Sequence, residues 1–402
     1  MSDSQTPAAG AAPFGRLWAS TAANNLADGI VHLVVPVAAV GRGATPTQVA
    51  LVVAAQLAPW LALSPVSGVL VDRLSAYAII RSASALRAAA GVGLLVALDS
   101  AIAPIALLAV TAAALGAAEV VADITAQTAV PDVVADTELE WAYGRVKATQ
   151  IAGDTLLGPA LGGLLLSLSA PSAILPAIGL FILGGAIVPP IDQRPGTNQG
   201  QGLRTQLAQG WRTSWDDRWI RRALLTVAAM NAGSVASATA LVVYAVEPGP
   251  LGLSEAEYGL LIGTAGLGAA IGGPLAGNLS RTLRPNLLIR IGAFGHLIVI
   301  SAPAIAWSPP VLAALLLVGS MLGPSLAITV ISTRQRRVPP ATRGRVNALF
   351  QTITTGTGTT SALAAGVMVT TLGYRATFIA ASLLATTITL ASRPWRLNTG
   401  TP

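Results

Sequence analysis

The sequence contains no cysteine and only two histidines, His32 and His296, among its 402 residues. Disulfides, thiolate metal sites and cysteine nucleophiles are therefore excluded, and a metal site built from histidines is not expected. Charged residues are also scarce, at 10% of the chain against about 25% in an ordinary soluble domain. We predict that the chain is not a soluble protein and that it holds no metal or other cofactor.

Long uncharged segments are abundant instead, and 53% of the residues are hydrophobic. A helix that crosses a membrane needs about 20 apolar residues. Twelve segments meet this requirement, near residues 14–40, 48–71, 79–98, 102–128, 147–169, 172–190, 220–246, 256–279, 286–307, 310–332, 346–371 and 374–391. The sequence therefore predicts an all-α integral membrane protein with twelve transmembrane helices.

One long polar interruption, at residues 191–219, divides the spans into two groups of six. We predict two six-helix bundles, at 14–190 and 220–392, with a polar N-terminal segment at 1–13 and a tail at 393–402. In the linker, a step of four residues relates Leu203, Leu207, Trp211, Trp215 and Trp219. This spacing is typical of an amphipathic helix on a membrane surface, and a helix that binds a partner protein is the alternative.

The basic residues are distributed unevenly along the chain, whose net charge is +7. Twelve spans put both termini on one side, with Arg42 and Arg375 on the other side and Arg87 inside a span. Of the 24 Lys and Arg residues, 24 − 3 = 21 then lie on the side of the termini. By the positive-inside rule that side is the cytoplasm of a cell-membrane protein, so the charge predicts orientation and not a nucleic-acid site.

Helix-breaking and small residues are concentrated in the fifth span, in the stretch GDTLLGPALGGLL at residues 153–165. Gly158 and Pro159 remove one backbone donor and most side-chain bulk, and Gly162 and Gly163 follow on the next turn. Such a helix can bend, and a neighbour can approach it closely. We predict a moving contact here, and static packing on small residues is the alternative.

A second gating candidate lies between the second and third spans. Gly68, Asp72 and Arg73 close the second span, and Arg81 begins the third. An acid at a helix end can pair with nearby arginines and hold the inner side shut until the pair breaks. A turn with orienting charges is the alternative interpretation.

Four stretches resemble a known family. GVLVDR at 68–73 resembles the loop motif of the major facilitator superfamily, and LLGPALGG at 156–163 resembles its fifth-span antiporter motif. LGLSEAEYGLLIGTAGLGAAIGGPLAG at 251–277 and VPPATRGRVNALF at 338–350 resemble the drug, macrolide and siderophore exporters of that superfamily. The resemblance covers residues 14–392. It implies export by alternating access, and it implies that the first and fourth spans line a central cavity.

Four acids lie inside predicted spans, all in the first half: Asp28, Glu119, Asp123 and Asp154. An ionised carboxylate in a bilayer costs several kcal/mol unless it is hydrated, paired or protonated. Steps of four align Asp28 with Asn24 and His32 on one span, and Glu119 with Asp123 on another. Because the two acidic spans are expected to face each other, neighbouring carboxylates would disfavour one another's charge, and at least one would exchange protons.

Our hypothesis is that Asp28, with Glu119 and Asp123, carries a coupling proton, that His32 assists, and that Asp154 connects this charge to the fifth span. Structural alternatives are a salt bridge from Asp28 to Arg87, hydration of Asp123 near the inner surface, and pairing of Asp154 with Lys147 or the loop arginines.

The second half has no acid inside a span, so we expect a bulky amphipathic substrate that is neutral or cationic. Candidate contacts are Asn24, Trp60, Met230 and Asn231. The sequence thus predicts a monomeric proton-driven exporter of hydrophobic molecules, with the bilayer, protons and the substrate as partners. An exporter of one natural product or siderophore is the alternative, and a channel or a membrane enzyme is less favoured because hinged halves suit alternating access.

Overall fold

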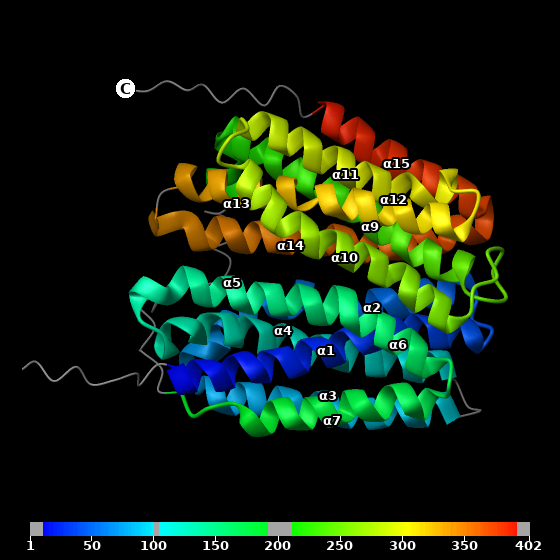
Figure 1. The fold of residues 1–402 in the computed structure, drawn as a ribbon, viewed down its shortest axis with the longest axis horizontal. Helices are drawn as coiled ribbons and strands as arrows, with labels where there is room; N and C mark the ends of the chain where they lie inside the picture. The colour runs from blue at the N-terminus through cyan, green and yellow to red at the C-terminus, as the bar shows by residue number, and fades with distance from the viewer. Residues whose placement is uncertain (1–10, 100–103, 192–210, 339, 392–402) are drawn as a thin grey trace, which may run out of the picture.

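A computed structural model describes residues 11–99, 104–191, 211–338 and 340–391, and these are almost entirely helical (Figure 1). The first half contains α1 (Ala11–Gly41), α2 (Pro46–Arg73), α3 (Ala76–Asp99), α4 (Pro104–Val133), α5 (Leu139–Gln150), the π-helix η2 (Ile151–Leu157), α6 (Gly158–Leu166) and α7 (Ala170–Ile187). The second half contains α9 (Arg218–Ala245), α10 (Glu255–Leu279), α11 (Pro285–Ile305), α12 (Pro309–Leu322), α13 (Pro324–Arg337), α14 (Pro340–Leu372) and α15 (Tyr374–Ala391). A short 3-10 turn, Asp136–Glu138, precedes α5.

The predicted all-α membrane fold is confirmed. Within the described residues, ten helices are long and apolar enough to cross a membrane, with α12 and α13 counted as one. The other two expected spans are helical as well: α5, η2 and α6 together form the fifth, and α14 forms the eleventh. Large apolar side chains such as Phe294 and Leu383 are exposed on the outer surface, where they would face lipid.

Local sequence signals determine where several helices begin. The Asp217 carboxylate accepts hydrogen bonds from the backbone N–H groups of Trp219 and Ile220 and caps α9. Ser254 and Glu257 form a capping box at the start of α10. Between α14 and α15 the chain turns at Gly373, whose φ of +83° is open to glycine at little cost. Single residues therefore suffice to end one span and begin the next.

The fifth span is not a uniform helix. Its middle section, η2, is π-helical, and α6 begins at Gly158 with Pro159 in its first turn. We expected a bend at the Gly-Pro pair itself. The irregular section instead precedes the pair, because proline is well tolerated in the first turn of a helix. A π-helical turn inserts an extra residue and often occurs at functional sites.

The linker prediction needs one correction. Trp219 is not part of a surface helix, since it is only 5% exposed within α9, after the cap at Asp217. Trp211 and Trp215 are exposed and stack with ring centroids 4.7 Å apart. Leu203 and Leu207 lie outside the described residues, so the rest of the predicted amphipathic helix stays a prediction.

The helices of each half group together in Figure 1, with α1 to α7 in one layer and α9 to α15 in the other. The start of α1 and the end of α15 lie at the same end, which we call the terminal end, and we call the opposite end the far end. The main contacts between the halves are those of α2 with α14 and of α10 with η2 and α6, and α9 makes smaller contacts with α1 and α2.

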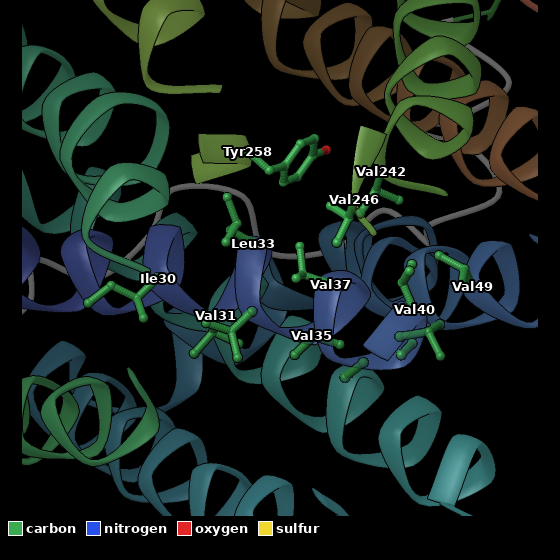
Figure 2. Close-up of a cluster of buried hydrophobic side chains, with 14 of the residues drawn as sticks. Ile30, Val31, Leu33, Val35, Val37, Val40, Val49, Val242, Val246 and Tyr258 are labelled. Atoms are coloured by element: carbon green, nitrogen blue, oxygen red, sulfur yellow. The ribbon is translucent and has the colours of Figure 1, made fainter. Parts of the chain in front are cut away.

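Close packing between the halves lies toward the far end. A Cβ atom added to Gly163 of α6 would lie 2.8 Å from Cα of Gly259 on α10. Figure 2 shows apolar side chains of both halves in one cluster, with Leu33 and Val37 of α1 near Val246 and Tyr258 of the second half. The far end is therefore closed by backbone contact and by a shared apolar core.

We predict that Gly163→Leu opens the far end. Its side chain would collide with the backbone of α10, and overpacking costs about 1–3 kcal/mol. The chain has no cysteine, so Val242→Cys introduces a single thiol at a position that is 2% exposed between the halves. A water-soluble maleimide should label this thiol about tenfold faster when Gly163→Leu is also present than when it is absent. Tenfold corresponds to about 1.4 kcal/mol in the free energy of opening.

Gly179→Leu is the matched control, because a Cβ atom at Gly179 would meet nothing within 4 Å. It should leave the labelling rate unchanged. Equal labelling of Val242→Cys with and without Gly163→Leu would show that this contact does not hold the far end shut.

Candidate functional site

Six ionisable side chains gather inside the first half. They are Asp28 and His32 on α1, Arg87 on α3, Glu119 and Asp123 on α4, and Asp154 on η2. All four acids that the sequence places inside spans belong to this group, which we call the charge cluster. Whether the cluster couples transport to protons stays a prediction at this point.

Arg87 occupies the innermost position of the cluster and is fully buried. Its Nη2 atom lies 3.3 Å from Oδ2 of Asp28 and 4.0 Å from Oδ1 of Asp123. The guanidinium carbon lies 5.5 Å from the ring centroid of Phe181 on α7. The alternative of an Asp28–Arg87 salt bridge is thus present, and Asp123 is buried beside it and not hydrated at a surface.

His32 forms the second part of the cluster. Its Nε2 atom lies 3.0 Å from Oε2 of Glu119, and its Nδ1 atom lies 2.9 Å from Oδ1 of Asp154. The side chains of His32 and Asp154 are 31% and 32% exposed, whereas the Arg87 side chain is 0% exposed. This part of the cluster is therefore less deeply buried than Arg87.

The geometry around His32 fixes a minimum number of protons. A neutral imidazole has one N–H donor and one nitrogen lone pair, and an ionised carboxylate can only accept. With both acids ionised, a neutral ring would point its lone pair at a carboxylate oxygen. Either the ring is doubly protonated, or Glu119 or Asp154 carries a proton. In each case the three groups together carry one proton more than a neutral imidazole with two ionised carboxylates would carry.

Two glycines bring Asp154 to His32. A Cβ atom added to Gly29 of α1 would lie 2.8 Å from Cα of Asp154, and one added to Gly153 would lie 2.9 Å from the backbone nitrogen of Leu26. Both positions face backbone atoms, so a larger residue would push η2 away from α1. The sequence indicates this close approach, but it does not indicate the π-helical turn that presents Asp154.

A hydrogen-bonded pair that the sequence prediction missed extends the cluster toward the terminal end. Nε2 of Gln150 donates to Oδ2 of Asp123 at 3.3 Å, and Nζ of Lys147 donates to Oε1 of Gln150 at 2.8 Å. Lys147 therefore contacts Gln150, and the cluster partner of Asp154 is His32. The available signal was the spacing of three between Lys147 and Gln150, which places them on one helix face.

A cavity of about 770 Å³ lies between the halves next to Lys147. The first half contributes α5 and the start of η2 to its wall, and the second half contributes α9 to α13. On α10, Ala269, Ala270, Gly273 and Pro274 line the cavity, whereas Glu255 and Gly259, nearer the far end, contact α6. The cavity thus lies on the terminal side of the closed contact.

The sequence matches a family model described as transmembrane secretion effector over residues 6–400. This match covers nearly the whole chain. The chain belongs to the major facilitator superfamily. The protein is accordingly a multi-pass transporter of small molecules and not an enzyme. No curated protein matches its sequence.

Solved structures of this superfamily share the fold. A point mutant of the nucleoside transporter NupG gives a TM-score of 0.75 at 12% identity, covering 94% of this chain and 98% of that chain. A bacterial homologue of the iron transporter ferroportin, in its inward-facing state, gives 0.70 at 17% identity with the same coverage. A POT family transporter in complex with a thioalcohol-conjugated peptide gives 0.72 at 12% identity, covering 94% of both chains. At these identities the likeness establishes the fold alone.

The four predicted substrate contacts are not among the described residues that line the cavity of this transporter. Asn24 and Met230 are buried inside their own halves, and Asn24 accepts a hydrogen bond from Ser84. Asn231 donates to the carbonyl of Thr354, and Trp60 is partly exposed. Their role in substrate binding stays a prediction.

The gating candidates fall in two places. Gly158 and Gly162 pack on α1, Gly163 packs on α10, and Pro159 is buried next to them. Arg81 is exposed and hydrogen-bonds the Tyr77 hydroxyl. The side chains of Asp72 and Arg73 and the environment of Gly68 are not described by the structure. A gate between the second and third spans therefore stays a prediction.

No three His, Cys, Asp or Glu side chains in the described part of the chain are arranged to hold a metal ion. In the charge cluster, the partners of these acids are instead Arg87 and His32.

We predict that Arg87→Met destabilises the protein by about 3–5 kcal/mol, because it leaves Asp28 and Asp123 buried without their cation. Arg87→Met combined with Asp28→Asn should recover part of this loss, since one unpaired charge is removed at the same time. Thermal unfolding of the detergent-solubilised protein measures both effects. Arg375→Met, at an exposed position, is the control, and an equal loss in it would contradict a specific role for the ion pair.

Proposed function

We propose that this transporter exports an apolar or amphipathic small molecule in exchange for protons. The observation that carries the proposal is His32, held between Glu119 and Asp154 at 3.0 and 2.9 Å. The hydrogen-bond geometry requires one proton beyond that of a neutral ring, and we propose that this proton is exchanged during transport. The partial exposure of His32 and Asp154 would give that proton a path to water.

The charge count of the whole cluster supports proton binding. Four carboxyl groups face two bases, so even with His32 charged the cluster would carry 4 − 2 = 2 surplus negative charges. The next cation, Lys147, reaches Asp123 only through Gln150. Surplus charge in an apolar bundle is costly, and protonation removes it.

The location of Asp154 suggests how the proton would affect the conformation. Its carboxylate contacts His32 in the first half, while the carbonyl of the next residue, Thr155, packs directly on Gly266 of α10 in the second half. A change in charge at Asp154 would therefore act one residue away from the contact between the halves. Coupling requires a charged site to bias a two-state element in this way.

The shape of the molecule favours alternating access as the mechanism. A closed far end and a cavity on the terminal side are the features of a carrier that is open on one side only. The TM-score to the ferroportin homologue is 0.70 for its inward-facing state and 0.61 for its outward-facing state. If the terminal end is cytoplasmic, as the basic residues predict, the cavity would take up substrate from the cytoplasm.

We predict that Glu119→Gln and Asp28→Asn each reduce proton-driven transport at least about tenfold. An amide side chain cannot bind and release a proton as a carboxyl group does. A tenfold lower transport rate corresponds to an activation free energy that is about 1.4 kcal/mol higher. The measurement is dye movement in proteoliposomes under an imposed pH gradient. The dyes are ethidium as a cation, Nile red as a neutral molecule and 11-(dansylamino)undecanoate as an anion.

Glu140→Gln is the matched control, because Glu140 is exposed on α5 outside the cluster. Transport that a protonophore does not slow in the unmodified protein would reject proton coupling. Normal gradient-driven rates in both cluster variants would show that these acids do not carry the proton.

A further inference from the structure

Among the described residues that line the cavity, Lys147 is the only Lys, Arg, Asp or Glu. The wall is otherwise made of glycine, alanine, proline, valine and isoleucine, with the hydroxyl groups of Ser234 and Ser320 and the ring of His296. No carboxyl group belongs to this described lining. A cationic substrate would find no opposite charge on it, whereas an anionic one would find an ammonium group.

Lys147 is held in position by the charge cluster. Its ammonium donates to Gln150, whose own amide donates to Asp123, so the side chain is oriented by a chain of two hydrogen bonds. An ammonium has three N–H donors, and Gln150 occupies one of them. Lys147 is exposed, so the others can face a ligand. A pre-oriented ammonium in apolar surroundings binds an anion more strongly than a mobile surface lysine does.

His296 offers a second polar group on the opposite wall. Its Nδ1 atom lies 2.9 Å from the carbonyl oxygen of Gly292, and a carbonyl only accepts, so Nδ1 carries a proton. The described residues include no partner for Nε2. The His296 ring lines the cavity from the second half, and Lys147 lines it from the first.

We propose that the substrate is an amphipathic anion, with a carboxylate that Lys147 binds and an apolar body that fills the cavity. This assignment rests on the proposed function, since it names the substrate class of the same cavity. It departs from the neutral or cationic substrate that the sequence led us to expect, because the acids of the first half are engaged with Arg87 and His32 and do not line the cavity.

The sequence provides a direct test, because Lys147 is the only lysine in the chain. The full-length protein in phosphatidylcholine nanodiscs is treated with sulfosuccinimidyl acetate, and acetylation of Lys147 is followed by mass spectrometry. The probe is 11-(dansylamino)undecanoate, and its methyl ester is the uncharged control. The carboxylate should slow acetylation about tenfold. This factor is expected if the carboxylate binds about 1.4 kcal/mol more tightly than the ester. The ester should not slow it.

Binding measured by dansyl fluorescence then separates charge from shape. Lys147→Gln should weaken binding of the carboxylate at least about tenfold and leave binding of the ester unchanged. Lys147→Arg keeps the positive charge and should retain most of the affinity for the carboxylate. Arg145→Gln is the matched control, because Arg145 lies on the same helix, contacts Trp18 and Trp141, and does not line the cavity.

Equal protection by carboxylate and ester, no protection by either, or unchanged carboxylate binding in Lys147→Gln would each overturn the assignment. None of these results depends on proton coupling, because no pH gradient is present. Conversely, if Lys147 binds the carboxylate but no gradient drives its transport, the proposed proton exchange fails and the assignment of an anionic substrate stands.

Discussion

The buried ion pair of Arg87 with Asp28, which Asp123 flanks, is the constraint on which the first half depends. A guanidinium without exposed surface requires opposite charge close by, and two helices, α1 and α4, supply it. Four residues later on α1 comes His32, and four residues earlier on α4 comes Glu119. Because α1 and α4 run in opposite directions, both steps lead about 6 Å the same way along the bundle. The ion pair thus fixes the register in which His32 meets Glu119.

Much of this arrangement could be predicted from the sequence. Uncharged segments of about 20 residues identify the spans, and steps of four place Asp28 with His32 and Glu119 with Asp123 on single helix faces. Charge inside an apolar segment is expensive, so the acids had to find partners. The partners themselves were less accessible. Arg87 entered only as an alternative, because nothing in one sequence reports which face of α3 turns toward α1.

Gln150 and the π-helical η2 could not be predicted in the same way. An amide next to a basic loop looks like any polar residue at a helix end, and its contact with Asp123 exists only once α4 and α5 are packed. Likewise, a π-helical turn has no composition of its own. The glycines at 153 and 29 indicate close packing, but the extra residue in the turn becomes visible only when the backbone of α1 is placed against it.

The position of the acids also explains why the charge of the spans does not predict the charge of the substrate. Acids on helices that border a cavity would on their own favour a cation. In this molecule their side chains turn into the first half, where they face Arg87 and His32, and the ammonium of Lys147 is left facing the space between the halves. A side chain that neutralises a buried group is not available to a ligand. The selectivity of such a cavity therefore follows from the groups that remain on its wall after the internal charges have been paired.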